Sequence, residues 1–158
     1  MNLKLGLLLL VSHTALLGVG FALGIYALPI LIAPSSPDLA EVSAIAAEAD
    51  YRGTFVRDLA DSDALHWGEG QVAIGREEVV FMGKLAPGPD YQLYFSPEFV
   101  ETERDFNRIK PDMLHVGPVK TFENFSVGLP PDFDPERYNT VIVWCETFGQ
   151  FITSARYR

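Results

Sequence analysis

The 158-residue sequence contains a single cysteine, Cys145. One cysteine excludes an internal disulfide, a cysteine-rich zinc site and the Cys-x-x-Cys-His attachment site of c-type haem. Bases are also few, with 12 Lys and Arg against 21 Asp and Glu. Lys4 is the only base before residue 34, so residues 34–158 carry 11 bases and all 21 acids, a net charge of -10. This balance excludes a nucleic-acid partner, because phosphate contacts need an excess of Lys and Arg.

Signatures of common hydrolases are absent too, since the sequence has neither Gly-x-Ser-x-Gly nor His-Glu-x-x-His. Hydrolase chemistry is therefore unsupported. Aromatic residues, in contrast, are plentiful, with 11 Phe, 6 Tyr and 2 Trp. Enough apolar side chains are present to build a core, which excludes disorder over most of the chain.

A stretch of 29 residues without a charged side chain, Leu5 to Ala33, dominates the N-terminus. As a helix rising about 1.5 Å per residue it reaches about 43 Å, against a hydrocarbon core of about 30 Å. A cleaved signal peptide is the alternative, but its apolar region runs about 7–15 residues and ends in small residues. Because Leu31-Ile32-Ala33 is a poor cleavage site, we expect an uncleaved signal anchor.

The charges that flank this segment predict its orientation. Lys4 and the α-amino group lie on its N-terminal side, whereas Asp38 and Glu41 follow it well before the first base, Arg52. By the positive-inside rule, the N-terminus is then cytoplasmic and the remainder of the chain is exported. We therefore predict a single-pass protein of the plasma membrane with its C-terminal domain on the periplasmic or extracellular side.

Beyond the apolar segment the pattern changes to short strands. Prolines end the segment at residues 34–37, and apolar residues at helical spacing then predict a short amphipathic helix or tether over 38–48. From residue 53 onward, β-rich runs alternate with clusters of Gly, Pro and Asp. The runs are Gly53–Arg57, Gln71–Ile74, Glu78–Lys84, Tyr91–Phe95, Met113–Val119, Thr121–Val127, Tyr138–Cys145 and Gln150–Tyr157.

These runs predict an all-β fold, namely an antiparallel β-sandwich of about eight strands. No long helix lies between them to form a βαβ crossover, which argues against a Rossmann-like fold. Residues 96–111 mix both charge signs and are expected to form a long loop or one helical turn. The expected organisation is a transmembrane anchor (1–33), a linker with a short helix (34–52) and a sandwich domain (53–158).

Metal binding finds little support in the sequence. One Cys, two His and Met residues outside the anchor are the ligand inventory of a blue-copper site. In cupredoxins a His and the Met follow the Cys within one loop, but neither residue type follows Cys145. The acidic runs 58–63 and 132–136 lack the spacing and turn glycine of a calcium loop. We therefore predict no metal site.

Cys145 closes the most strand-like run of the sequence. Alternation places Val141, Val143 and Cys145 on one face of that strand, and Ile142 and Trp144 on the other. A thiol on the core face is usually a small buried hydrophobe, and an acidic domain disfavours thiolate. These arguments oppose a freely nucleophilic cysteine but not a thiol that ligates a cofactor metal. An unpaired cysteine in an oxidising compartment is also open to oxidation and crosslinking.

The run from Tyr138 to Arg156, YNTVIVWCETFGQFITSAR, resembles the closing signature of the DM13 family of exported electron-transfer domains. Its Tyr-x-x-Val-x-x-Trp-Cys segment carries the resemblance, which covers residues 53–157 in order. The other matching segments are Gly53-Thr54-Phe55, His66 with Gly70–Ile74, Gly88-Pro89-Asp90-Tyr91 with Leu93–Ser96, and Val116-Gly117 with Val119-Lys120. The acidic stretch from Pro97 to Asp112 departs from the short link expected there.

The resemblance implies a β-sandwich whose cysteine takes part in redox chemistry, either as a bare thiol or as a ligand of a prosthetic group such as haem. This role falls on Cys145, with Trp144 as its signature neighbour and His66 as the matching upstream histidine. His66 and Met82 are further candidates for haem ligation because their side chains can bind iron. The protein is then expected to pass electrons to a redox partner protein beside the membrane, rather than to act as a stand-alone enzyme.

A competing hypothesis is a module without redox function. In that case Cys145 is a packing residue, and the sandwich binds a ligand or another protein through an exposed aromatic surface. The two hypotheses differ in what surrounds the sulfur atom, because a redox thiol needs a cavity, a histidine or a channel beside it.

Overall fold

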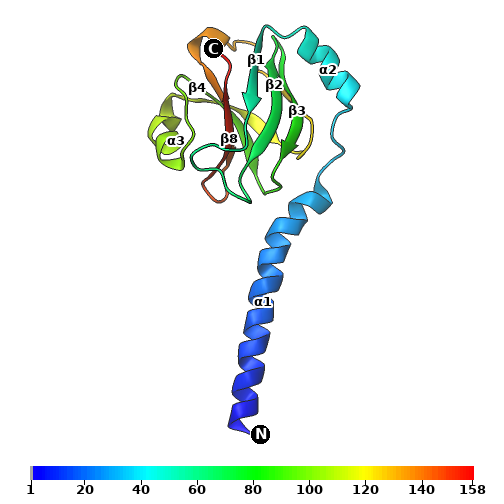
Figure 1. The fold of residues 1–158 in the computed structure, drawn as a ribbon, viewed down its shortest axis with the longest axis vertical. Coiled ribbons are helices and arrows are strands. Elements are labelled where there is room, and N and C mark those ends of the chain that lie inside the picture. The colour runs from blue at the N-terminus through cyan, green and yellow to red at the C-terminus, as the bar shows by residue number, and fades with distance from the viewer. Residues whose placement is uncertain (1) are drawn as a thin grey trace.

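The computed structural model describes residues 2–158 and begins with one long helix, α1 (Leu3–Ile32). Its Asn2 side chain accepts a hydrogen bond from the backbone N–H of Lys4 and so caps the first turn. None of the α1 side chains is buried, and the helix leaves the globular part as a single rod (Figure 1). By length and composition, α1 is long and apolar enough to cross a membrane.

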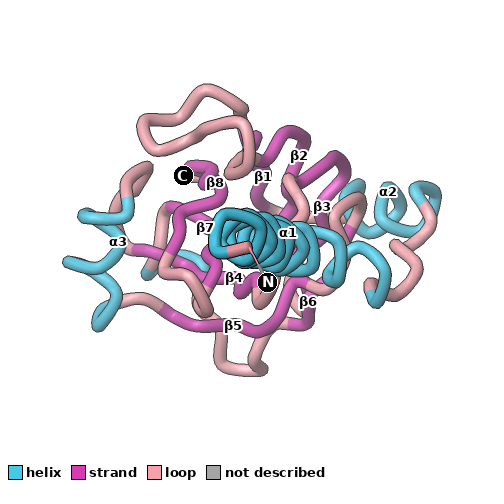
Figure 2. Tube along the Cα trace, turned by 90° about the horizontal axis from the view of Figure 1, so that it is seen from below, coloured by secondary structure: helices cyan, strands magenta, loops and turns pink. Residues whose placement is uncertain are grey.

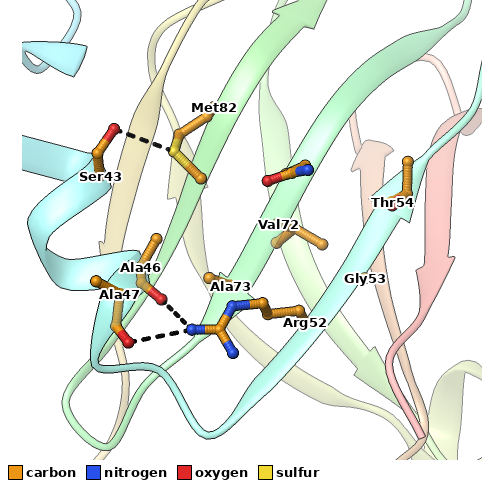
Figure 3. Close-up of a pocket in the computed structure, with 10 residues that line it drawn as sticks. Ser43, Ala46, Ala47, Arg52, Gly53, Thr54, Val72, Ala73 and Met82 are labelled. Carbon is orange, nitrogen blue, oxygen red and sulfur yellow. Dashed lines mark hydrogen bonds between the residues drawn. The ribbon is translucent and has the colours of Figure 1, made fainter. Parts of the chain in front are cut away.

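A short helix, α2 (Leu39–Ala47), follows the linker as the apolar spacing predicted. The carboxylate of Asp38 caps its first turn by accepting a hydrogen bond from the N–H of Ala40 at 3.0 Å. At its other end, the Arg52 guanidinium donates to the carbonyl oxygens of Ala46 and Ala47 at 2.7 and 3.2 Å (Figure 3). These contacts hold α2 against the outer face of the sheet that Arg52 belongs to.

Eight antiparallel strands form two four-stranded sheets, which confirms the predicted sandwich. The first sheet has the order β1-β2-β3-β6 and the second has the order β5-β4-β7-β8. The bounds in the first sheet are β1 (Tyr51–Phe55), β2 (Gly68–Ile74), β3 (Glu78–Leu85) and β6 (Phe125–Gly128). Those in the second are β4 (Tyr91–Ser96), β5 (Leu114–Val119), β7 (Thr140–Cys145) and β8 (Gln150–Arg156).

The main core lies between the two sheets and is rich in aromatic rings. Phe55, Phe81 and Phe125 are neighbours along the first sheet, with ring centroids 5.3 and 5.0 Å apart. Phe95 of the second sheet packs edge-on against Tyr157. A view along α1 shows this helix meeting one end of the sandwich rather than a sheet face (Figure 2). The core is therefore closed by the sheets on its sides, and α1 approaches its end.

Two segments differ from the predictions. The strand expected from Thr121 starts only at Phe125, because residues 121–124 form a turn in which Thr121 Oγ1 donates to the Asn124 carbonyl. The loop expected over 96–111 contains a helix, α3 (Glu103–Ile109), with a 3₁₀ turn, η1 (Lys110–Asp112), after it. Thr102 caps α3 by accepting the backbone N–H of Asp105, and such a cap supports two turns where we expected one.

Candidate functional site

Cys145 is the last residue of β7 and faces the core between the sheets. Val141 and Val143 share this face, whereas Ile142 and Trp144 belong to a second apolar cluster on the outside of the sheet. The predicted alternation along this strand is thereby confirmed. The Cys145 side chain is only 2% exposed, so its surroundings decide whether the sulfur can act.

The loop between β3 and β4 holds the thiol directly. Cys145 Sγ donates a hydrogen bond to the carbonyl oxygen of Pro89 at 3.1 Å. Burial raises the pKa of the thiol, and the charge of Asp90 adds to this, although backbone N–H groups of Phe148 and Thr147 act in the opposite sense. The net effect favours a neutral thiol, so Cys145 is not an activated nucleophile.

A pocket of about 380 Å³ opens beside Cys145. Its walls are mainly apolar, and they bring together segments that are far apart in the sequence. The lining residues are Ala22, Ile25 and Tyr26 of α1, Leu65, His66, Pro87, Gly88, Pro89, Tyr91, Cys145, Phe148, Gln150 and Ile152. The sulfur is therefore buried against a cavity that contains a histidine, and it is not enclosed by aliphatic neighbours on every side.

His66 reaches this pocket from the loop between β1 and β2. Its Nδ1 lies 3.0 Å from Asp63 Oδ2, and the other carboxylate oxygen accepts the backbone N–H groups of Leu65 and His66. The hydrogen bond with His66 is the main cause of a lowered pKa for Asp63. An ionised Asp63 orients the ring by accepting a hydrogen bond from Nδ1–H, which leaves Nε2 as the ring nitrogen available to a ligand.

In the segment Gly88-Pro89-Asp90-Tyr91, all residues except Asp90 line the pocket. The buried Tyr91 is the strand neighbour of Cys145, and its hydroxyl donates to the Ala86 carbonyl at 2.8 Å. Asp90 has a positive φ of 54°, and its carbonyl oxygen accepts the backbone N–H of Glu146 at 3.1 Å. The β3–β4 loop is therefore bonded to the end of β7 at two successive residues, Cys145 and Glu146.

Trp144 does not line this pocket. Its ring stacks on Phe106 of α3, with centroids 3.8 Å apart and an interplanar angle of 7°. The Lys110 ammonium lies 6.0 Å from the Trp144 ring centroid and forms an ion pair with Glu146 at 2.7 Å. The structure thus separates the two signature residues, with Cys145 on the inner face of β7 and Trp144 on the outer face.

The residue after the signature cysteine, Glu146, was not singled out by the sequence. It accepts hydrogen bonds from the Lys110 ammonium and from the Tyr94 hydroxyl. Partial burial acts to raise the pKa of Glu146, but these two donors outweigh it and the pKa is lowered. No local pattern links Lys110 to Glu146, so the sequence offered no signal for this ion pair.

The other ligand candidates lie elsewhere. Met82 of β3 is on the outer face of the first sheet, where its Sδ lies 3.5 Å from Ser43 Oγ of α2 (Figure 3). His115 of β5 is exposed, and its Nε2 lies 2.9 Å from Gln92 Oε1. Among residues 2–158, no group of three or more His, Cys, Asp or Glu side chains is placed to hold a metal ion. Of the proposed cofactor ligands, the structure brings only His66 to the pocket of Cys145.

Comparison with protein families gives one match. The model described as "Electron transfer DM13" covers residues 58–157, which is most of the chain and includes Cys145. The chain belongs to the DM13 electron-transfer family. Neither the curated proteins nor the solved structures give a match to this chain. The matched residues include all of the sandwich except β1, and the family description supports a redox role.

Proposed function

We propose that this DM13 protein is a membrane-anchored electron-transfer module whose Cys145 pocket holds the group that carries the electron. The observation that supports this is the placement of Cys145 and His66 on the walls of one pocket of about 380 Å³. Pockets for small ligands are typically about 300–1,000 Å³, mostly apolar, with a few polar groups. The Cys145 pocket has these properties.

A bound group is needed because the sulfur alone is poorly suited to the task. The chain has no second cysteine, so a thiol–disulfide cycle within it is impossible. Burial also raises the pKa of the Cys145 thiol, which disfavours the thiolate that attacks a partner's disulfide. Cys145 therefore acts as a contact or ligand of the redox group rather than as the electron carrier itself.

The donor atoms of this pocket are of the kind that bind haem iron, since a thiol and an imidazole both line it. A haem bound there would supply one-electron chemistry at its iron. Cys145 would first have to break its hydrogen bond to Pro89, and α1 borders the space on one side. Binding of haem therefore requires the Cys145 thiol and α1 to move.

The anchor sets where this chemistry takes place. Lys4 lies before the apolar helix and the acidic domain lies after it, which supports a cytoplasmic N-terminus and an exported domain. Tethering confines the domain to the membrane surface and raises its effective concentration toward redox partners there. A redox partner at the membrane is thus part of the proposal.

An absorption spectrum of the full-length protein in detergent, with and without added haemin, tests the proposal. A Soret band that is lost in Cys145→Ser and weakened in His66→Ala supports iron ligation in the pocket. His115→Ala is the matched control, because His115 is exposed on β5 and lies outside the pocket. The competing hypothesis, a module with a purely structural cysteine, predicts a protein that stays colourless with added haemin and whose thiol reacts only after unfolding.

A further inference from the structure

The pocket of Cys145 is bordered by the membrane helix itself, and this points to the source of its ligand. Building on the proposed function, we propose that the pocket is loaded from the lipid bilayer and binds the ring of a membrane-dissolved quinone or hydroquinone. Three independent features support this: the depth of the α1 residues in the wall, the apolar rim, and the chemistry of the polar groups inside.

The depth of the pocket-lining α1 residues in the bilayer follows from their distance along the helix from Lys4. A hydrocarbon core of about 30 Å takes about 20 helical residues at 1.5 Å each. With Lys4 at the cytoplasmic surface, the apolar residues from Leu5 to Gly24 fill that thickness. Ala22 then lies inside the outer edge of the hydrocarbon, and Tyr26 lies just beyond it. Both residues line the pocket, so the opening is at the boundary between lipid tails and head groups.

The exposed residues that line the pocket are apolar, as is typical of a surface in contact with lipid. Outside α1, the large apolar side chains that are exposed in residues 2–158 are Leu39, Val56, Leu65 and Phe148. Two of these four, Leu65 at 57% and Phe148 at 51% exposure, line the Cys145 pocket. Tyr26 adds the aromatic ring that is typical of a membrane–water interface. An apolar molecule can thus pass from the bilayer to the pocket without crossing water.

The interior favours a neutral ring with oxygen substituents. Its apolar walls suit an uncharged aromatic body. Asp63 is bonded to His66 and the charge of Asp90 acts on Cys145, so both carboxylates disfavour an anion beside these two lining residues. His66 offers Nε2 as an acceptor for a hydroquinone hydroxyl, because Nδ1 is held by Asp63. The amide of Gln150 can donate to a quinone carbonyl. A long-chain quinone combines such a ring with the lipid solubility that the entrance requires.

Photolabelling in phosphatidylcholine nanodiscs tests this inference on the full-length protein. The probe is a decyl-substituted benzoquinone that carries an aryl azide, and labelled residues are located by mass spectrometry. We expect labels near Tyr26 and Phe148, and competition by unlabelled decyl-benzoquinone but not by a water-soluble quinone sulfonate. Two variants compare equal changes on the same helix: Ala22→Phe fills the pocket wall, and Ala15→Phe lies two turns away from it.

Filling the pocket in Ala22→Phe is expected to weaken labelling by about tenfold, whereas Ala15→Phe stays within about twofold of the parent. Equal labelling of both variants, or labels spread along α1, would overturn the inference. Equal competition by the quinone sulfonate would also overturn it, because the ring would then enter from water. A Soret band that depends on Cys145, without quinone labelling, overturns this inference but keeps the proposed function. If neither the Soret band nor the quinone labelling is observed, both this inference and the proposed function are overturned.

Discussion

Gly88 and Tyr91 both line the Cys145 pocket, and a side chain at residue 88 would collide with the Tyr91 ring. A Cβ atom added at Gly88 would be 2.8 Å from both Cε1 and Cζ of the Tyr91 ring, and closer still to its hydroxyl oxygen. Tyr91 is 2% exposed on a central strand, and its hydroxyl is bonded to the Ala86 carbonyl. The ring therefore cannot move aside without breaking a buried hydrogen bond. We predict that Gly88→Ala destabilises the domain and distorts the pocket.

The size of the effect has two parts. Overpacking a well-filled core costs about 1–3 kcal/mol, and leaving the Ala86 carbonyl without its donor costs about 1–2 kcal/mol more. Gly88→Ala should therefore lower the free energy of unfolding by about 2–5 kcal/mol. Tyr91→Phe removes only the hydrogen bond and should lower it by about 1–2 kcal/mol.

A double-mutant cycle measures whether the two changes act through the same contact. Urea unfolding of the full-length protein in detergent, followed by tryptophan fluorescence, gives the four free energies. Because the double variant loses the hydrogen bond only once, its destabilisation should be smaller than the sum of the single changes by about 1 kcal/mol. Gly128→Ala is the control, since the nearest atom to its added Cβ is a carbonyl oxygen 4.0 Å away.

Additive effects in this cycle would refute the proposed collision. So would a Gly88→Ala variant that is as stable as Gly128→Ala, because the β3–β4 loop would then be free to move away from Tyr91. In either case the β3–β4 loop would be mobile, and Pro89 would not be held in a fixed position against the sulfur.

Three further predictions follow from other contacts. Burial raises the pKa of Cys145, so maleimide should label the folded chain more slowly than the urea-unfolded chain at pH 8, and the free energy of unfolding should fall as pH rises above the ordinary thiol pKa. In Lys110→Met the pKa of Glu146 should rise toward its ordinary value, and the loss of stability that the parent shows as pH falls below that value should shrink. Gly83→Ala should destabilise by about 3 kcal/mol or more, because its Cβ would collide with the Glu69 carbonyl; a melting temperature equal to the parent's would contradict this.

Local patterns in the sequence predicted most of the strands and their inward and outward faces. Alternation predicted that Val143 and Cys145 face the core and Trp144 does not, because a strand's side chains must point to opposite faces. The two wrong predictions, at the start of β6 and at α3, concern segments in which a threonine side chain forms a hydrogen bond with the backbone. Thr121 closes a turn before β6, and Thr102 begins a helix in a segment expected to be a loop. Both threonines stand three residues before an Asn or Asp, a spacing that is typical of such local structure.

The candidate site was predictable only in part. Cys145 and His66 were found through residue chemistry and family resemblance, and the structure places both at one pocket. Its other walls come from α1 and from the turn after β7, and no periodicity relates Tyr26 to Phe148. Their proximity depends on how the linker lets α1 approach the end of the sandwich, which is a tertiary property. Trp144, whose place beside Cys145 in the sequence suggested a shared site, lies across the sheet.

The position of α1 at the Cys145 pocket supports a role for this helix beyond the tethering proposed above. A helix that only held the domain at the membrane could lie anywhere on the sandwich, but the last third of α1 runs past the pocket of the single cysteine. Ala22 and Tyr26 form part of the pocket wall, so removing α1 would open that wall to water. A domain studied without its helix would then lack the apolar entrance and expose Cys145 to oxidation. Ligand binding should accordingly be measured on the full-length chain in a bilayer, where the proposed pocket is complete.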